Sequence, residues 1–152
     1  MARNFYTYSG IAATPVANPE TVAQIVAAAN TRVVLLAVEI NPLGATAATA
    51  PIPFNLVVQT DAGGMSDDSA QIVADAPVAS ETRQTTILKR GGAEPASTAK
   101  NAGQLSIHQQ GSRLWVPPNA RREIIIAGGT RLGLRYASAT FVSTQITLYF
   151  EE

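Results

Sequence analysis

The last third of the chain, residues 108–152, is divided into short apolar runs by turn-forming residues. Pro117-Pro118-Asn119 and Gly128-Gly129 interrupt these runs at near-regular intervals. Short runs that are rich in β-branched residues and bounded by Gly, Pro and Asn are typical of β-strands joined by turns. The pattern therefore indicates consecutive strands and constrains the whole chain to a fold built from them.

Similar punctuation divides the rest of the chain and gives a count of about eight strands. Besides residues 20–29, the predicted strands are residues 31–40, 54–60, 81–90, 104–116 (one or two strands around Gln110-Gly111), 122–127, 130–136 and 140–150. In the last of these, the period-two alternation predicts that Val142, Thr144, Ile146, Leu148 and Phe150 face the core and that the residues between them are half-exposed. Residues 91–103 are expected to form a flexible connection.

Two segments leave room for helical structure. Residues 20–29 fit a short helix with Asn18 as N-cap and Pro19 at the first helical position, but they also alternate as a strand. We prefer the strand because the remainder of the chain is strand-like. Residues 65–80 have room for one helical turn, with Ser66 as its cap and two acidic residues near its N-terminus.

Strands that do not alternate with helices rule out a parallel α/β plan and indicate an antiparallel sandwich or barrel. Among sandwiches we predict the jelly-roll type, because about eight strands with long early loops suit it. The 152 residues are most simply one domain with a single core. The predicted organisation is an extended N-terminal arm at residues 1–19, followed by a single β-sandwich domain at residues 20–152.

The predicted N-terminal arm carries three aromatic residues, Phe5, Tyr6 and Tyr8, among small residues. Such an arm either packs on its own domain or reaches a neighbouring molecule. Aromatic side chains anchor protein interfaces at a low entropy cost. We therefore predict that these three residues contact a partner or a second copy of the chain.

Charged residues make up only 14% of the chain, against about 25% in an average soluble domain. A surface with so little charge is explained if part of it is buried in an assembly; a monomer kept in solution by Thr and Gln is the alternative. Residues 1–76 hold two cations and six acids, and residues 77–152 hold nine cations and five acids. This asymmetry would steer head-to-tail contacts between copies if the two halves were separate in space, but we prefer the alternative that the halves interleave and the difference vanishes.

The sequence offers no clear catalytic, nucleic-acid or membrane signature. It has no cysteine, and His108 is its only histidine, so Cys-based and multi-histidine metal sites are excluded. There is no G-x-S-x-G motif, no dense basic patch and no apolar run of about 20 residues. We predict a non-enzymatic protein without a cofactor, in which His108 is structural.

Three further features of the sequence have both a structural and a functional interpretation. The acidic stretch from Asp61 to Asp68 could offer oxygens to calcium, but it lacks the spacing of a calcium loop and is more simply a solvated turn. Gly128-Gly129 has no phosphate-loop context and is expected to be a β-turn. Trp115 is expected to plug the core or its rim, although stacking on a sugar or a partner is the alternative.

Several turn and strand segments carry a resemblance to a known type of protein. They are Asn30-Thr31-Arg32, Asp75-Ala76-Pro77, residues 107–111 (IHQQG), residues 115–118 (WVPP), residues 122–126 (REIII) with Gly128-Gly129, residues 131–135 (RLGLR) and Phe150-Glu151-Glu152. With these segments, residues 20–152 resemble small jelly-roll virion proteins of tailed bacteriophages, of the capsid decoration or cement type.

The resemblance implies a structural role on the outside of a virion. Proteins of this type form oligomers, often trimers, which sit on the capsid lattice and bridge subunits of the major capsid protein. Two other classes stay open: a phage tail or fibre module that binds host glycan, marked by exposed aromatics and acids in one groove, and a β-sandwich hydrolase, which needs clustered acids or a serine near His108.

Overall fold

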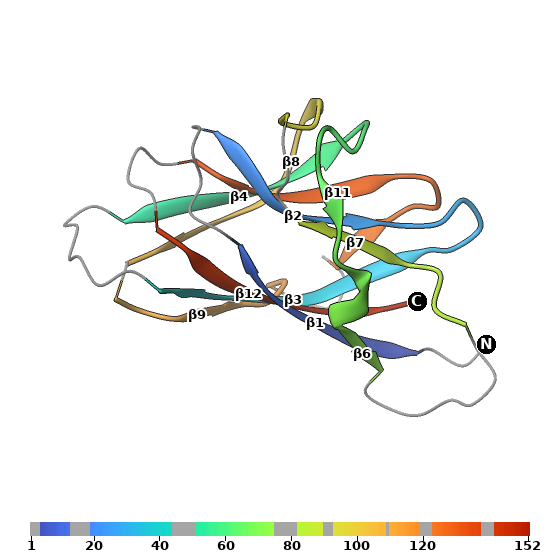
Figure 1. Ribbon diagram of the computed structural model, residues 1–152, viewed down its shortest axis with the longest axis horizontal. Coiled ribbons are helices and arrows are strands. Elements are labelled where there is room, and N and C mark those ends of the chain that lie inside the picture. The colour runs from blue at the N-terminus through green and yellow to red at the C-terminus, as the bar shows by residue number, and fades with distance from the viewer. Residues whose placement is uncertain are drawn as a thin grey trace.

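The structure, a computed structural model, describes residues 4–12, 19–43, 51–74, 82–89, 93–108, 110–118, 123–137 and 142–152, without the side chains of residues 99 and 100. These residues form two six-stranded antiparallel sheets that pack against each other as two layers (Figure 1). The predicted all-β antiparallel sandwich is thereby confirmed. We call the layers sheet A and sheet B.

Each sheet is assembled from strands that are distant in sequence. Sheet A has the order β10-β3-β12-β1-β6, with β9 also paired to β3; its strands are β1 (Phe5–Ala12), β3 (Val33–Pro42), β6 (Ile72–Ala74), β9 (Arg113–Trp115), β10 (Ile124–Ile126) and β12 (Thr144–Glu151). Sheet B has the order β5-β7-β2-β11-β4-β8; its strands are β2 (Glu20–Val26), β4 (Ile52–Gln59), β5 (Ser66–Asp67), β7 (Thr86–Lys89), β8 (Ser97–Ile107) and β11 (Arg131–Tyr136).

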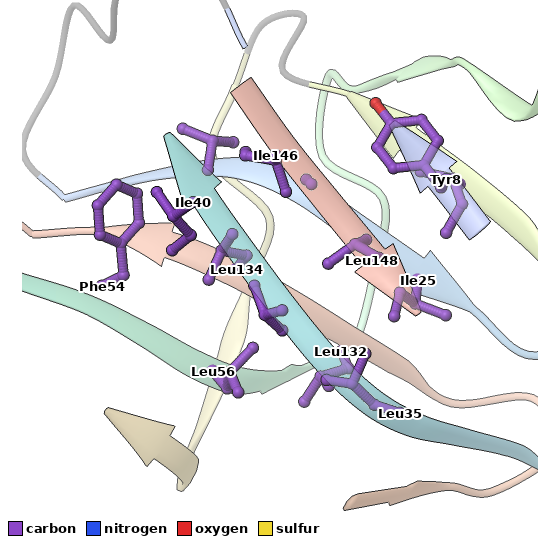
Figure 2. Close-up of a cluster of buried hydrophobic side chains, with 14 of the residues drawn as sticks. Tyr8, Ile25, Leu35, Ile40, Phe54, Leu56, Leu132, Leu134, Ile146 and Leu148 are labelled. Carbon is purple, nitrogen blue, oxygen red and sulfur yellow. The ribbon is translucent and has the colours of Figure 1, made fainter. Parts of the chain in front are cut away.

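The hydrophobic core lies between the two sheets. Leu35, Ile146 and Leu148 from sheet A meet Leu56 and Leu132 from sheet B, as Figure 2 shows. Two aromatic pairs lie within it: Phe54 and Tyr136 are edge to face, with ring centroids 5.2 Å apart, and Tyr6 stacks on Phe150 at 5.6 Å. Because large apolar side chains from both layers fill this space, their burial holds the sandwich together.

Most of the predicted strands are present. Residues 20–26 form a strand rather than a helix, and residues 104–116 contribute to two strands, the end of β8 and β9. In β12 and the two residues before it, the five side chains predicted to face the core are all buried. Positions 81, 90, 122, 140 and 141 of the predicted strands lie outside the described residues.

The prediction of an extended N-terminal arm is wrong for residues 5–12. These residues form β1, which lies in the interior of sheet A. The strand pairs with β12 from Phe5↔Glu151 to Ala12↔Thr144, and with β6 on its other side. Tyr6, Tyr8 and Ala12 face the core, while the residues that alternate with them, from Phe5 to Ile11, lie on the other side of the sheet. The sequence pattern hid this strand because the alternation includes a glycine and few aliphatic residues.

Two smaller predictions also need correction. Residues 97–103 are not a flexible connection, because they form the first part of β8 and pair along β4 across two register shifts. The helical turn is a 3-10 helix, η1 (Ser69–Gln71), that begins after Asp68 rather than Ser66. Ser66 belongs to β5, and the turn is instead fixed by Asp67, whose Oδ1 accepts the N–H of Ser69 at 2.9 Å.

Candidate functional site

The outward-facing side of sheet A, which we call the A face, is the candidate site. The strand register sets its cross-strand rows: Thr7 lies beside Val73 on one side and Tyr149 on the other, and Thr147 lies between Ser9 and Glu39. Because side chains alternate along a strand, these residues point away from the core that Tyr6, Tyr8 and Leu148 fill. The A face is thus made of Thr, Ser, Gln and Tyr side chains with apolar residues among them.

The A face concentrates the exposed large apolar side chains of the molecule. Among the described residues there are seven such side chains. Five of them lie in strands of sheet A and point outward: Phe5 and Ile11 in β1, Val73 in β6, Leu114 in β9 and Ile125 in β10. The other two, Leu43 and Val116, directly follow β3 and β9. Ile11, Val73 and Leu114 are 60% or more exposed. Apolar side chains gathered on one face indicate an interaction surface.

The outward-facing side of sheet B is different, because residues 93–97 lie across it. The N–H of Thr60 donates to the Ala96 carbonyl at 2.9 Å, and the N–H of Gly64 donates to the Ala93 carbonyl at 2.8 Å. The Glu94 carboxylate accepts the N–H and the hydroxyl of Thr21 at 2.6 and 2.7 Å, and it forms an ion pair with Arg135 at 3.1 Å. This segment therefore shields sheet B from partners where it crosses.

Below that segment lies a buried chain of hydrogen bonds. The Gln24 amide donates to Gln59 Oε1 at 2.7 Å, and the Gln59 amide donates to Thr21 Oγ1 at 2.7 Å. All three side chains are at most 2% exposed. They cross β11 at Gly133, where a methyl group would overlap the Gln59 amide. This network is structural, since every member is satisfied within the chain.

A polar groove of about 430 Å³ lies at the edge of β1 beyond β6, lined by Ser9, Gly10, Ile11, Asp68, Gln71, Lys89 and Gln145. The Tyr8 hydroxyl donates to Asp68 Oδ2 at 2.8 Å, and Lys89 pairs with the other oxygen of the carboxylate at 2.9 Å. Figure 2 shows Tyr8 at the margin of the buried cluster. No aromatic ring is among the described residues that line the groove, so it lacks the stacking surface that marks a glycan site.

Burial, and then the hydrogen bond to Asp68, raise the pKa of the Tyr8 hydroxyl well above its usual value. Above about pH 10 the unfolded chain therefore loses this proton while the folded chain keeps it, and the free energy of unfolding should fall as the pH rises. Urea denaturation of Tyr8→Phe between pH 8 and 11 should show a shallower decline than the wild type. Some decline should persist, because burial also raises the pKa of Tyr6. Equal slopes in the two proteins would contradict the assignment.

The three predicted partner-contact residues have separate positions. Tyr6 and Tyr8 are 5% and 2% exposed, so they pack on their own domain, and only Phe5, 45% exposed, lies on the A face. The other contributors to this face, such as Leu114 and Ile125, were missed because apolar residues in short strands were assigned to the core. The sequence does contain a signal for Leu114. Neighbouring residues of a strand point to opposite sides, so an inward-facing Trp115 places Leu114 on the outward side.

The other residues discussed in the sequence analysis, His108, Trp115 and Gly128-Gly129, lie in turns or at the edge of the core. His108 is exposed directly after β8, where its Nδ1 accepts the N–H of Gln110 at 3.3 Å. Trp115 is partly buried against the core near Gly103, as expected of a rim plug. Gly128-Gly129 forms a turn, with a φ of 76° at Gly129.

The acidic stretch is engaged internally. Asp61 Oδ1 accepts the N–H groups of Gly63 and Ala96 at 2.9 and 3.1 Å, while Asp67 and Asp68 bind Ser69 and Tyr8. Within the described part of the chain, no three His, Cys, Asp or Glu side chains come together as metal ligands would. The same part of the chain contains no helix of the length and hydrophobicity needed to cross a membrane.

Comparison with known proteins identifies no relative. No family model, no curated protein and no solved structure matches the chain.

Proposed function

We propose that the protein is a non-enzymatic structural component of a bacteriophage virion. In this role it decorates the exterior of the capsid and binds subunits of the major capsid protein through the A face. It acts as an oligomer, with a trimer as the expected form. The proposal combines the resemblance of the strand and turn segments with the surface chemistry of sheet A.

One observation carries the proposal: the exposed large apolar side chains of the described residues gather on or beside one sheet face. A face with exposed apolar side chains of this kind suits contact with another protein surface, because burying apolar area supplies the free energy of association. The outer side of sheet B supports the same choice of face, since residues 93–97 lie across it and Glu94 already binds Thr21 and Arg135 there.

We also infer that the sandwich is of the jelly-roll type. Eight strands have the nested orders β1-β12-β3-β10 and β2-β11-β4-β8, and the chain alternates between the sheets at β1, β2, β3 and β4. Strands β9 and β10 lie one after the other along β3, at Val38–Ile40 and Val33–Leu35, as one interrupted strand would. This order is the one that two Greek keys packed as two sheets produce.

The mechanism is stabilisation by binding, without a chemical step. A rigid sandwich that contacts two or more capsid subunits favours the assembled shell over its dissociated parts by mass action. Linked contacts to neighbouring subunits add avidity, because the second contact forms at a high effective concentration.

Substitutions on the A face should weaken capsid binding without unfolding the protein. We expect Ile11→Ser combined with Leu114→Ser to reduce the affinity for purified capsids at least about tenfold, since fully burying one large apolar side chain is worth about 1.5–3 kcal/mol. Cosedimentation measures the affinity, and thermal unfolding shows whether the fold is intact.

Gln104→Ser, at an exposed position of β8 in the other sheet, is the matched control and should bind like the wild type. Equal binding of the double variant would exclude the A face as the contact. Failure of the wild-type protein to bind capsids of any candidate host phage would contradict the proposed function itself, and a specific response on a glycan array would support the tail-module alternative.

A further inference from the structure

Glu39 has a fixed carboxylate in the middle of the A face. It lies on β3, which is flanked by β12 and β9, with Thr147 and Leu114 directly across from it. The amide of Asn41 donates to its Oε1 at 3.2 Å, and the Tyr149 hydroxyl donates to its Oε2 at 3.3 Å. The side chain is thus held in one orientation by two neighbours from the same face.

These two hydrogen bonds leave the carboxylate able to accept more. Each carboxylate oxygen has two lone pairs, and Asn41 and Tyr149 use one on Oε1 and one on Oε2. Two parallel acceptor positions on one carboxylate match the fork of an arginine guanidinium, which binds in a bidentate way. An ammonium group has no such fork, so arginine suits the geometry better than lysine.

The charge of the A face points the same way. Among the described outward-facing strand residues of β1, β3, β6, β9, β10 and β12, the side chains charged at neutral pH are Glu39 and Glu151. Glu151 is only 4% exposed, so Glu39 is the one of the two that a partner can reach. Arg113, on β9, follows the opposite alternation from Leu114 and donates to the Ser106 carbonyl of β8 at 2.8 Å. The A face thus presents the Glu39 carboxylate among apolar side chains, and it complements a surface with a cation among apolar side chains.

Covering such a face without a cation would be unfavourable. Exposed Leu114 stands beside Glu39, so a partner that packs on the apolar side chains also removes water from the carboxylate. A desolvated carboxylate without a positive partner carries a large energetic cost. A stable complex at this face thus needs a cation at this position.

We propose that the protein partner of the A face places an arginine side chain, surrounded by apolar residues, against the Glu39 carboxylate. This inference rests on the proposed function for the identity of the partner, a capsid subunit, but the surface chemistry stands without it. The arginine forms a bidentate pair with Glu39, and its aliphatic stem packs beside Leu114.

The first test uses Glu39→Gln, which keeps the shape of the side chain and removes its charge. We expect its affinity for capsids to fall at least about tenfold, as truncation of a buried charged pair does, and the dependence of binding on salt to weaken. Asp67→Asn, which removes one exposed negative charge at the edge of the other sheet, is the control and should bind like the wild type. Wild-type affinity for Glu39→Gln would overturn the inference while leaving the proposed function in place.

The second test does not need capsids. The peptide acetyl-Leu-Arg-Leu-amide is titrated into the protein and compared with the same peptide carrying citrulline, which is neutral and of the same shape as arginine. We expect the arginine peptide to shift the amide resonances of Glu39 and Thr147 more strongly than the citrulline peptide, and this preference to disappear in Glu39→Gln. No shift at Glu39, or equal shifts with both peptides, would contradict the inference. A preference for arginine in a protein that does not bind capsids would support it and refute only the proposed function.

Discussion

Deletion of residues 2–10 should abolish the folded state. The deletion removes most of β1, which lies between β12 and β6 in sheet A, and leaves the edge of β12 unpaired over most of its length. It also removes the buried rings of Tyr6 and Tyr8, of which Tyr6 stacks on Phe150. Loss of one large buried aromatic costs about 3–5 kcal/mol, so loss of both approaches the whole stability of a typical domain, about 5–15 kcal/mol.

The measurement is the cooperative thermal transition, followed by circular dichroism, with the amount of soluble protein as a second readout. Phe5→Ser is the matched control within the same strand, because the Phe5 side chain is exposed. We expect this variant to unfold within a few degrees of the wild type, since surface substitutions usually change stability by less than about 0.5 kcal/mol. A folded deletion variant with a normal transition would show that residues 2–10 are a detachable arm after all.

The N-terminal strand also shows the limit of the sequence patterns. Strands such as β3 and β12 could be predicted because β-branched residues and a clear alternation specify them locally. In β1 the inward positions are Tyr6, Tyr8, Gly10 and Ala12, which do not form a hydrophobic run. Its place is determined by pairing with β12, more than 130 residues away, and such non-local pairing leaves no local signal.

The sequence did not locate the exposed apolar side chains of the A face. The low charge predicts a surface that is buried in an assembly, and this stays a prediction; alternation along a strand does not tell which side of a sheet packs on the core. Gln24 and Gln59 have the polar character of a solvent-facing side, yet both are buried, and Gln24 also donates to the Asp61 carbonyl and accepts from Arg131. Leu114 and Ile125 have the character of a core, and both are exposed. The packing of distant segments decides these outcomes.

Substitution of Gly133 should be strongly destabilising although it adds only one methyl group. A β-carbon there would overlap the Gln59 amide, so Gln59 must move and its hydrogen bonds to Gln24 and Thr21 must break. Overpacking costs about 1–3 kcal/mol and each buried polar group left unsatisfied costs a similar amount, so we expect Gly133→Ala to lower the free energy of unfolding by about 3 kcal/mol. Urea denaturation measures this change.

Two further variants separate the overlap from a general effect of alanine. At Gly111 a β-carbon meets only the His108 carbonyl, at the ordinary distance of 3.6 Å, so Gly111→Ala should change stability by less than about 0.5 kcal/mol. In a Gln59→Ala background the added methyl at Gly133 has room, because the overlapping amide is gone. The double variant should therefore be no less stable than Gln59→Ala alone, a coupling that only residues in contact show. Additive losses would mean that Gln59 does not lie across Gly133, and that the buried network of sheet B is arranged differently.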